Sequence, residues 1–198
     1  MLAAGYTGLK FEAGCDEAGR GCLMGPVFAA AVILTPDFFN EEINDSKKLT
    51  AKKRDSLRII IEREAVAWAV ASVPEDEIDR MNILNASILA MHKALDQLTP
   101  PPEYILVDGN RFKPYKNISH RSFVKGDGLF LSIAAASILA KTHRDSFVEQ
   151  LHMEYPDYGW LQNKGYGTAA HIKAIENHGL TPYHRKSFSL KKQLSLGF

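Results

Sequence analysis

Four carboxylates, Asp16, Glu17, Asp108 and Asp127, are the residues of this sequence best placed to do chemistry. Each stands where a strand is expected to end or a helix to begin, and rigid elements hold catalytic groups more precisely than loops do. Two divalent cations about 3.5–4 Å apart require bridging and flanking carboxylate oxygens of this kind. Hard oxygen ligands favour Mg²⁺ or Mn²⁺ over zinc. The four acids therefore indicate a two-metal hydrolase site.

Each acid also has an ordinary structural interpretation. Asp108 precedes Gly109 and Asn110 and could belong to a simple turn. Asp127 could cap the helix that follows it. Asp16 and Glu17 are neighbours, and side chains of neighbouring strand residues point to opposite faces. Both can reach one site only if the strand ends or bulges there, or if one of them contributes its backbone carbonyl.

Hydrophobic patterns show which elements must hold these acids. An apolar run over 25–34 indicates a buried strand, preceded by a shorter strand over 11–16 and a glycine-containing turn, which together predict a hairpin. Further strands are expected at 65–73, 104–107 and 118–124, and helices at 50–64, from 74, at 83–98, at 129–155 and near 168–178. Because strands and helices interleave, we expect an α/β fold with a mixed central sheet flanked by helices.

Composition is that of a globular domain able to bury a core: 198 residues, 45% hydrophobic and 24% charged. No apolar run approaches the ~18 residues of a membrane span. The first ten residues lack the basic and apolar regions of a signal peptide. Cys15 and Cys22 make no disulfide framework and are too few for a zinc site by themselves. We therefore expect a cytoplasmic protein with two reduced thiols.

Charge is distributed unevenly although the net charge is only +1. Residues 1–110 carry 11 Lys and Arg against 17 Asp and Glu, whereas residues 111–198 carry 13 against 6. An acidic half followed by a basic half suits a protein that brings carboxylates to a phosphate backbone. The alternative is a chance asymmetry that is neutralised within the fold.

Local sequences are more specific than the spacing of the acids. Seven segments resemble the motifs of ribonuclease HII in that family's order, from about residue 10 to residue 188. They are Gly14-Cys-Asp-Glu-Ala-Gly-Arg-Gly-Cys-Leu-Met-Gly-Pro-Val27, Asp45-Ser-Lys-Lys-Leu49, Val107-Asp-Gly-Asn110, Lys125-Gly-Asp127, Ser132–Lys141 with Arg144-Asp145, Lys164-Gly-Tyr-Gly-Thr168 and His184-Arg-Lys-Ser-Phe188.

This resemblance implies an RNase H-like core that hydrolyses RNA paired with DNA and cuts 5′ of single ribonucleotides, as in ribonucleotide removal and Okazaki primer processing. It casts the four acids as the metal-binding catalytic set. By similarity, the backbone of Gly19, Arg20 and Gly21 reads the ribose 2′-hydroxyl, and Tyr166 stacks on the following sugar. Glycines permit close approach of main-chain amides, and the 2′-hydroxyl distinguishes RNA from DNA. Arg20 could instead be a salt-bridge partner, and Tyr166 an ordinary half-buried aromatic.

Several basic and polar residues within the motifs are expected to contact phosphates, although a solvated surface position is the alternative for any one of them. They are Lys47, Lys48, Lys141, His184, Arg185 and Ser187. Asp145 could support the site from behind, but an exposed acid on a helix is the favoured interpretation. Cys22 stands where the family usually has proline, and Met24 where a small residue is common. Both residues flank the glycine turn, so they bear on how the turn fits the substrate and not on the reaction carried out by the four acids.

The last six residues resemble the short peptide with which bacterial replication and repair proteins dock on the sliding clamp. Its glutamine and apolar anchors would be Gln193, Leu194, Leu196 and Phe198. Alternatively, these residues fold back and cover the core. The resemblance predicts a catalytic core over 1–155, a helical substrate-binding region packed on it over 156–192, and this tail over 193–198, in a monomer.

Two other functions compete with this interpretation. A ribonuclease H specialised for long hybrids would be expected to lack the pairing of Gly19-Arg-Gly21 with Gly165-Tyr-Gly167, and this chain has both. A catalytically idle nucleic-acid-binding module would tolerate loss of the four acids, all of which are present. Fold alone would not decide between them.

Overall fold

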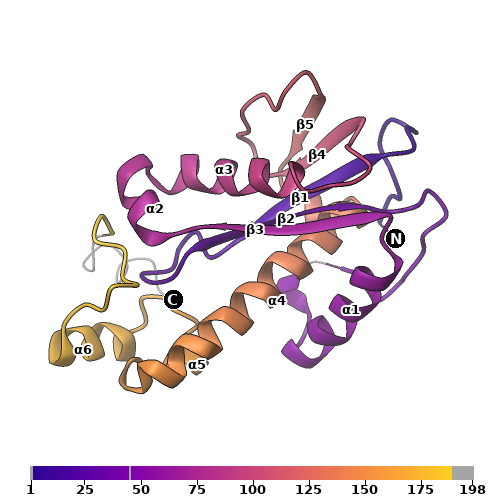
Figure 1. Cartoon of the computed structure of the whole chain (residues 1–198). Coiled ribbons are helices and arrows are strands. Elements are labelled where there is room, and N and C mark those ends of the chain that lie inside the picture. Colours follow the sequence, from indigo (N-terminus) through magenta and orange to yellow (C-terminus); the bar gives the residue numbers. More distant parts are fainter. Residues whose placement is uncertain (1, 45, 189–198) are drawn as a thin grey trace.

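A single mixed sheet organises the chain. The computed structural model describes residues 2–44 and 46–188. The five strands lie in the order β3-β2-β1-β4-β5 (Figure 1). They are β1 (Glu12–Ala18), β2 (Val27–Ile33), β3 (Ala67–Val73), β4 (Tyr104–Asp108) and β5 (Ser119–Phe123). β1 pairs antiparallel with β2 and parallel with β4, so the expected hairpin and the expected mixed sheet are both confirmed.

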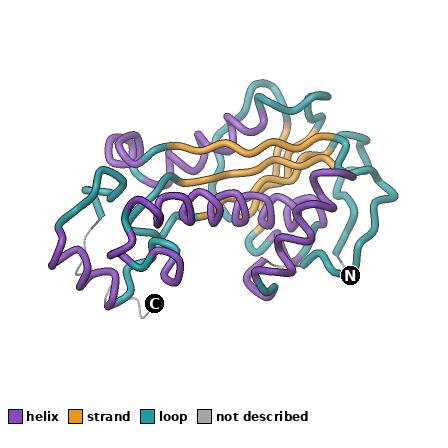
Figure 2. Tube along the Cα trace, turned by 60° about the horizontal axis from the view of Figure 1, so that its bottom comes forward, coloured by secondary structure: helices purple, strands orange, loops and turns teal. Residues whose placement is uncertain are grey.

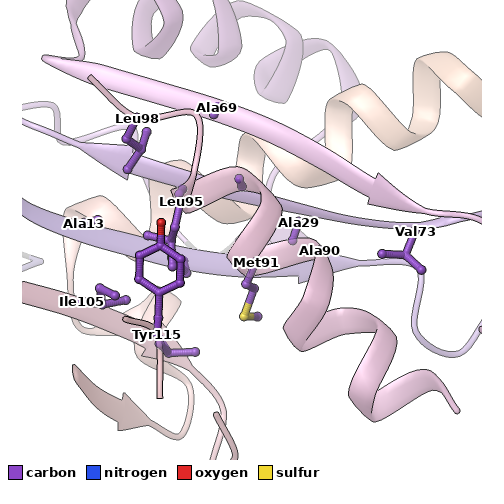
Figure 3. Close-up of a cluster of buried hydrophobic side chains, with 14 of the residues drawn as sticks. Ala13, Ala29, Ala69, Val73, Ala90, Met91, Leu95, Leu98, Ile105 and Tyr115 are labelled. Carbon is purple, nitrogen blue, oxygen red and sulfur yellow. The ribbon is translucent and has the colours of Figure 1, made fainter. Parts of the chain in front are cut away.

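Helices cover both faces of the sheet (Figures 1 and 2). One face carries α2 (Glu75–Met81) and α3 (Ile83–Leu95), and the other carries α1 (Ala51–Glu64) and α4 (Leu131–Glu154). Strand β2 shows the alternation that this requires: Ala29 and Ala31 pack towards α3, whereas Ala30 and Val32 pack towards α4. Figure 3 shows the α3 side, where small strand residues receive larger helix side chains.

Helix α4 passes very close to β1. A β-carbon on Gly14 would lie 2.5 Å from the carbonyl oxygen of Ser132, so only glycine fits at that strand position. The helix presents buried alanines to the sheet, among them Ala135 and Ala136. This close packing brings the first turns of α4 beside the end of β1, where Asp16 lies.

Most elements fall where the sequence predicts them, with differences of a few residues at their ends. Thr50 caps α1 as expected and accepts a hydrogen bond from the amide of Lys53. Helix α3 ends at Leu95, three residues before its expected end. The sequence did not predict four short pieces: η1 (Ser46–Lys48), η2 (Gly126–Gly128), η3 (Pro156–Tyr158) and α5 (Trp160–Asn163). Each is at most four residues long, too short to produce a periodic pattern.

The segment after α4 packs back on the far end of that helix. Helix α6 (Ala169–His178) and the short pieces before it share an apolar cluster with the glycine turn that follows β1. Trp160 is its largest fully buried side chain, and Leu23 and Met24 belong to the same cluster. Among the residues that the structure describes, none of the helices combines the length and hydrophobicity of a membrane span. The clamp-binding tail predicted at 193–198 lies outside the described residues.

Candidate active site

Asp16 and Asp108 lie side by side at the ends of neighbouring parallel strands. The register pairs Cys15 with Val107, so the next residue of each strand falls at the same level. Cys15 and Val107 point into the core beneath α3, so Asp16 and Asp108 point to the α4 face. Asp16 is only 5% exposed. The structure thus places two of the four expected acids together on one face.

Negative charge is crowded around Asp16. Burial raises the pKa of its carboxyl well above the usual value, and the neighbouring Glu17 and Asp108 raise it further. A hydrogen bond from the Glu17 amide to Asp16 Oδ1, 2.6 Å long, and contact with Ser137 partly oppose this. A carboxylate with two acidic neighbours in a nearly dry setting is a group that bound cations would stabilise.

Glu17 lies one residue before the end of β1. The strand continues without a bulge to Ala18, with Glu17 paired to Ala29. β1 therefore neither ends nor bulges at Asp16 and Glu17, and of the alternatives that let both residues reach one site, a contribution from one of them through its backbone carbonyl is the one compatible with this regular pairing. The Glu17 carboxylate forms a salt bridge of 2.9 Å with Arg20 and lines pockets on both sides of the strand.

Asp127 lies in a tight turn before α4 that contacts Asp108. Its neighbour Gly126 donates its amide to Asp108 Oδ1 at 2.7 Å, which ties the turn to the end of β4. Asp127 itself is 6% exposed and lies in η2. The residue that caps α4 is Phe130, so the interpretation of Asp127 as the cap of that helix is wrong.

Next to Asp16 lies a pocket of about 230 Å³. Its walls come from the end of β1, the glycine turn, η1, α1, α4 and the loop before α6. The lining residues are Asp16, Glu17, Ala18, Gly19, Arg20, Gly21, Ser46, Arg54, Ser137, Lys141 and Tyr166. The structure therefore brings Gly19, Arg20, Gly21 and Tyr166 into one pocket with two of the acids.

The glycine turn (residues 19–26) and the Tyr166 loop (residues 164–168) are hydrogen-bonded to each other. Leu23 donates its amide to the carbonyl of Gly165 at 2.8 Å. A β-carbon on Gly21 would lie 3.7 Å from the Tyr166 ring. Gly165 has φ +84° and packs on Met24, where a side chain would not fit. These contacts make the two loops opposite walls of one pocket.

Cys22 and Met24, the two departures from the usual pattern, lie at this junction. Cys22 is fully buried and contacts the carbonyl of Lys164 through its sulfur, at 3.6 Å. The pKa of Tyr166 is raised to about 12, mainly because Cys22 lies near its phenol and secondarily because the phenol is partly buried. The phenol therefore stays protonated at neutral pH. Both sulfur-containing side chains therefore pack behind the pocket wall.

Comparison with known proteins decides the assignment. The model of the family described as Ribonuclease HII matches residues 13–191. The chain belongs to the ribonuclease HII family. The ribonuclease HII of Parabacteroides distasonis is 64% identical over 190 residues, which cover 96% of each chain. That of Bacteroides thetaiotaomicron is 61% identical over 189 residues, 94% of each.

A solved structure agrees with this. The crystal structure of ribonuclease H2 from Pyrococcus horikoshii superposes with a TM-score of 0.76 at 25% identity and covers 93% of this chain and 97% of that one. As a ribonuclease HII, the chain is a divalent-metal-dependent ribonuclease H endonuclease that binds RNA-containing nucleic acid. The expected family and the expected RNase H-like fold are therefore confirmed.

In this ribonuclease HII, Arg144 is a structural residue that sequence reasoning missed. It is 1% exposed and lies beneath Gly19, and its guanidinium donates to the carbonyls of Lys164 at 2.9 Å and Met24 at 3.1 Å. A signal was present: Arg144 stands four residues from both Ala140 and Val148, on the buried stripe of its helix. A cation on such a stripe must satisfy its donors inside the protein.

His184 and Arg185 are buried, so the expectation that they contact phosphate is wrong. Each is 2% exposed. His184 Nδ1 accepts from the amide of Thr181 at 2.9 Å. Arg185 donates two bonds to the carbonyl of Gly25 and one, of 3.0 Å, to that of Arg20. The Arg185 side chain supports the glycine turn from within, and neither buried side chain is placed to contact a phosphate in solvent.

The remaining expected phosphate contacts differ among themselves. Ser187 is exposed, but its hydroxyl donates to Asp79 at 2.5 Å. Lys48 is exposed on η1, which also contains Lys47; the side chain of Lys47 lies outside what the structure describes. Lys141 lines the pocket and remains a suitable phosphate contact.

Asp145 supports Lys141 from behind the pocket. Its carboxylate is 2.8 Å from Lys141 Nζ and 4.0 Å from Arg54 Nη2, and its side chain is 14% exposed. The favoured interpretation of Asp145 as an exposed helix acid is therefore wrong, and the supporting role is the one the contacts fit. Arg54, Ser46 and Ser137 line the same pocket and were not singled out from the sequence.

The acids form an open site and not a closed cage. In residues 2–44 and 46–188, no three or more His, Cys, Asp or Glu side chains are grouped so as to enclose a metal ion. Mg²⁺ commonly binds through one or two carboxylates together with waters and substrate phosphates. The crowded negative charge at Asp16 and Asp108 fits such a site, with Glu17 next to Asp16 and with Asp127 adjacent in sequence to the Gly126 amide that binds Asp108.

Proposed function

We propose that the protein cuts duplex DNA 5′ of a single embedded ribonucleotide as well as the RNA strand of hybrids. The observation that carries this is the shared pocket: the glycine turn and Tyr166 face each other beside Asp16 and Glu17. If this pocket recognises one ribose 2′-hydroxyl beside the hydrolytic acids, a single ribonucleotide is enough to direct the cut.

The walls of the pocket suit the two sides of an RNA–DNA junction. Gly19 and Gly21 let main-chain groups approach a ribose closely, and Arg185 and Arg144 hold that turn in shape. The Tyr166 ring lies against Gly21 and would stack on the next sugar. A ring pressed on that sugar tolerates deoxyribose, whereas an additional hydroxyl would crowd it.

The four acids are proposed to hold two divalent cations, Mg²⁺ or Mn²⁺, with Asp16 and Asp108 as the central pair. When bound, the ions would supply activation of water and stabilisation of the leaving oxygen, giving 5′-phosphate and 3′-hydroxyl ends. Glu17 would orient water near the scissile phosphate, while its salt bridge to Arg20 links it to the glycine turn. Asp145 keeps Lys141 extended into the pocket, where its ammonium would meet the phosphate backbone.

Cleavage of two labelled duplexes tests this proposal. One carries a single ribonucleotide in DNA, and the other a continuous RNA strand on DNA, each with Mg²⁺ or Mn²⁺. We expect a cut 5′ of the lone ribonucleotide, which the Asp16→Asn variant loses. Cleavage of the continuous hybrid alone would overturn the roles given to the glycine turn and Tyr166 and leave the metal site standing. No cleavage of either duplex would contradict the assignment of the acids.

We further propose roles in ribonucleotide removal and Okazaki primer processing, carried out by a monomer in the cytoplasm. The two thiols support a reducing compartment, since Cys15 and Cys22 are both free and buried. We propose the division into a core over 1–155 and a substrate-binding region over 156–192 because the Tyr166 loop, which forms one pocket wall, lies after α4.

A further inference from the structure

A buried polar network lies directly behind Tyr166. It consists of Trp160, His171, Thr181 and His184, whose exposed fractions are 0%, 0%, 6% and 2%. His171 Nδ1 lies 2.9 Å from the carbonyl oxygen of Tyr166. The network joins α5, the Tyr166 loop, helix α6 and the segment that follows it.

The hydrogen bonds assign a proton to each ring nitrogen. A carbonyl oxygen only accepts, so His171 Nδ1 carries a hydrogen and donates it to Tyr166. His184 Nδ1 accepts from the Thr181 amide, so the hydrogen of His184 lies on Nε2. His171 Nε2 is then the acceptor for His184 Nε2 at 3.2 Å and for Trp160 Nε1 at 3.0 Å.

Both imidazoles are neutral in this arrangement. Burial lowers the pKa of His171, and burial together with the neighbouring His171 lowers that of His184 to about 4. Each ring nitrogen has a partner, and the single lone pair of His171 Nε2 is shared by two donors. Such a network fixes a backbone position more sharply than apolar packing alone.

The Tyr166 carbonyl connects this network to the pocket, because Tyr166 lines the pocket and its carbonyl is hydrogen-bonded to His171. It accepts from the Thr168 amide at 2.9 Å as well as from His171, and the Tyr166 amide donates to Asn163 at 2.9 Å. His184 also forms a bridge with Met24 of the glycine turn. The network thus touches both loops that form the pocket walls.

We infer that His171 is a positioning residue for strand cleavage: its Nδ1–H holds the Tyr166 backbone so that the ring faces the glycine turn at the correct angle. This inference rests on the proposed role of Tyr166 at the sugar. His171 touches neither substrate nor metal and acts only through Tyr166. A displacement of about 1 Å in a positioning element can lower a rate on the order of 100-fold.

Two substitutions isolate the hydrogen bond. His171→Asn places an amide N–H near the position of Nδ1, whereas His171→Leu removes the donor. Both lose the acceptor that Trp160 and His184 use, so they differ mainly in the donor to Tyr166. On the single-ribonucleotide duplex, we expect His171→Leu to lower kcat/KM roughly 10- to 100-fold and His171→Asn to recover most of that loss. His178→Leu, an exposed position on the same helix, is the matched control.

A double substitution shows whether His171 acts through Tyr166. If it does, adding His171→Leu to Tyr166→Ala lowers kcat/KM no further than Tyr166→Ala alone. Thermal unfolding of each variant reports whether the fold persists. Losses that multiply, or a His171→Asn variant as impaired as His171→Leu, would assign His171 to stability alone and overturn the inference.

The outcome also separates this inference from the proposed function. If Tyr166→Ala cuts the single-ribonucleotide duplex as well as the unchanged protein, the proposed role of Tyr166 fails first. If Tyr166→Ala is impaired and His171→Leu is not, only the inference fails. Independently of activity, ¹⁵N spectra of labelled histidines should show His171 with its hydrogen on Nδ1 and His184 with its hydrogen on Nε2; the reverse tautomers would also overturn it.

Discussion

Gly19 lies directly on the guanidinium of Arg144, so closely that a β-carbon at position 19 would be 2.6 Å from Arg144 Cδ and nearer still to Nε. The same arginine donates to Met24 and Lys164, one in each wall of the pocket. The Arg144 side chain therefore sets the separation of the two walls. Because residue 19 is glycine, the turn can pack directly against that side chain. A residue that is not one of the acids therefore contacts both walls of the pocket.

The first prediction is that Gly19→Ala impairs cleavage at a single ribonucleotide by roughly 100-fold. Alanine is strained at φ +91°, and its methyl group would collide with Arg144. The turn must therefore move away from the Arg144 side chain. The loss should appear in kcat/KM on the single-ribonucleotide duplex.

A matched control separates strain from collision. Gly8 has φ +79° and nothing within 4 Å of an added β-carbon. Gly8→Ala therefore introduces comparable backbone strain without crowding and should retain cleavage. Equal activity of the Gly19→Ala and unchanged proteins would show that Arg144 does not fix the turn.

The second prediction is that Asp16→Asn abolishes cleavage and raises the Tm of the metal-free protein. Burial beside Glu17 and Asp108 disfavours the ionised form of Asp16 in the folded protein, and asparagine removes that cost while keeping an oxygen for the Glu17 amide. A single stabilising substitution commonly adds about 0.5–2 kcal/mol. For a chain of this size, about 1 kcal/mol corresponds to roughly 2–4 °C. Thermal unfolding in chelator measures it.

The pH dependence of that gain has a definite sign. The pKa of Asp16 is higher in the folded protein than in the unfolded chain, so protonation of Asp16 favours folding. As pH rises through the folded-state pKa, the unchanged protein therefore loses stability relative to the Asp16→Asn variant. The advantage of Asp16→Asn should therefore shrink as pH falls. Added Mg²⁺ or Mn²⁺ should stabilise the unchanged protein more than the variant. A constant Tm difference at every pH would contradict this account.

The sheet and the acids were predictable because their signals are local. Apolar runs and helical spacing mark the elements, and a carboxylate at the end of such a run marks a strand end. The sequence could not say how Asp16 and Glu17 share a site, since that depends on whether β1 ends, bulges or stays paired at these two residues, and it stays paired. It also could not distinguish Asp127 in η2 from a helix cap, because a three-residue turn leaves no periodicity.

Buried charge was the main source of error. A basic residue in a motif suggests a phosphate contact, yet Arg185 gives its donors to the carbonyls of Gly25 and Arg20. Sequence shows that a cation is present but not whether backbone carbonyls are free to receive it inside the fold. Asp145 illustrates the same limit: Lys141 lies one turn before it on α4, but Arg54 reaches it only when α1 packs on α4.

The third prediction concerns residues 193–198, which lie outside the described residues. Deleting them should leave cleavage of short duplexes unchanged and abolish binding to the sliding clamp, because Leu194, Leu196 and Phe198 are the proposed apolar anchors. Surface plasmon resonance against purified bacterial clamp measures the binding. Clamp binding that survives the deletion would refute the proposal, whereas reduced Tm and activity would favour a tail folded onto the core.

The fourth prediction contrasts Lys141 with Arg185 through the salt dependence of binding. A lysine that neutralises one phosphate contributes about 0.7–0.9 to the slope of log K against log salt. Lys141→Gln should lower the slope for a catalytically inactive protein on the single-ribonucleotide duplex by about that amount. Lys173→Gln, at an exposed helix position outside the pocket, should leave the slope unchanged.

Arg185 should behave in the opposite way. Because its guanidinium is buried and bonded to the carbonyls of Gly25 and Arg20, Arg185→Gln removes no phosphate contact and should leave the slope as it is. It should instead lower the Tm and slow cleavage, since the glycine turn loses three internal hydrogen bonds. Fluorescence anisotropy across a salt series, with thermal unfolding in parallel, measures both effects. A reduced slope for Arg185→Gln with an unchanged Tm would mean that Arg185 meets the nucleic acid directly, against its burial in this structure.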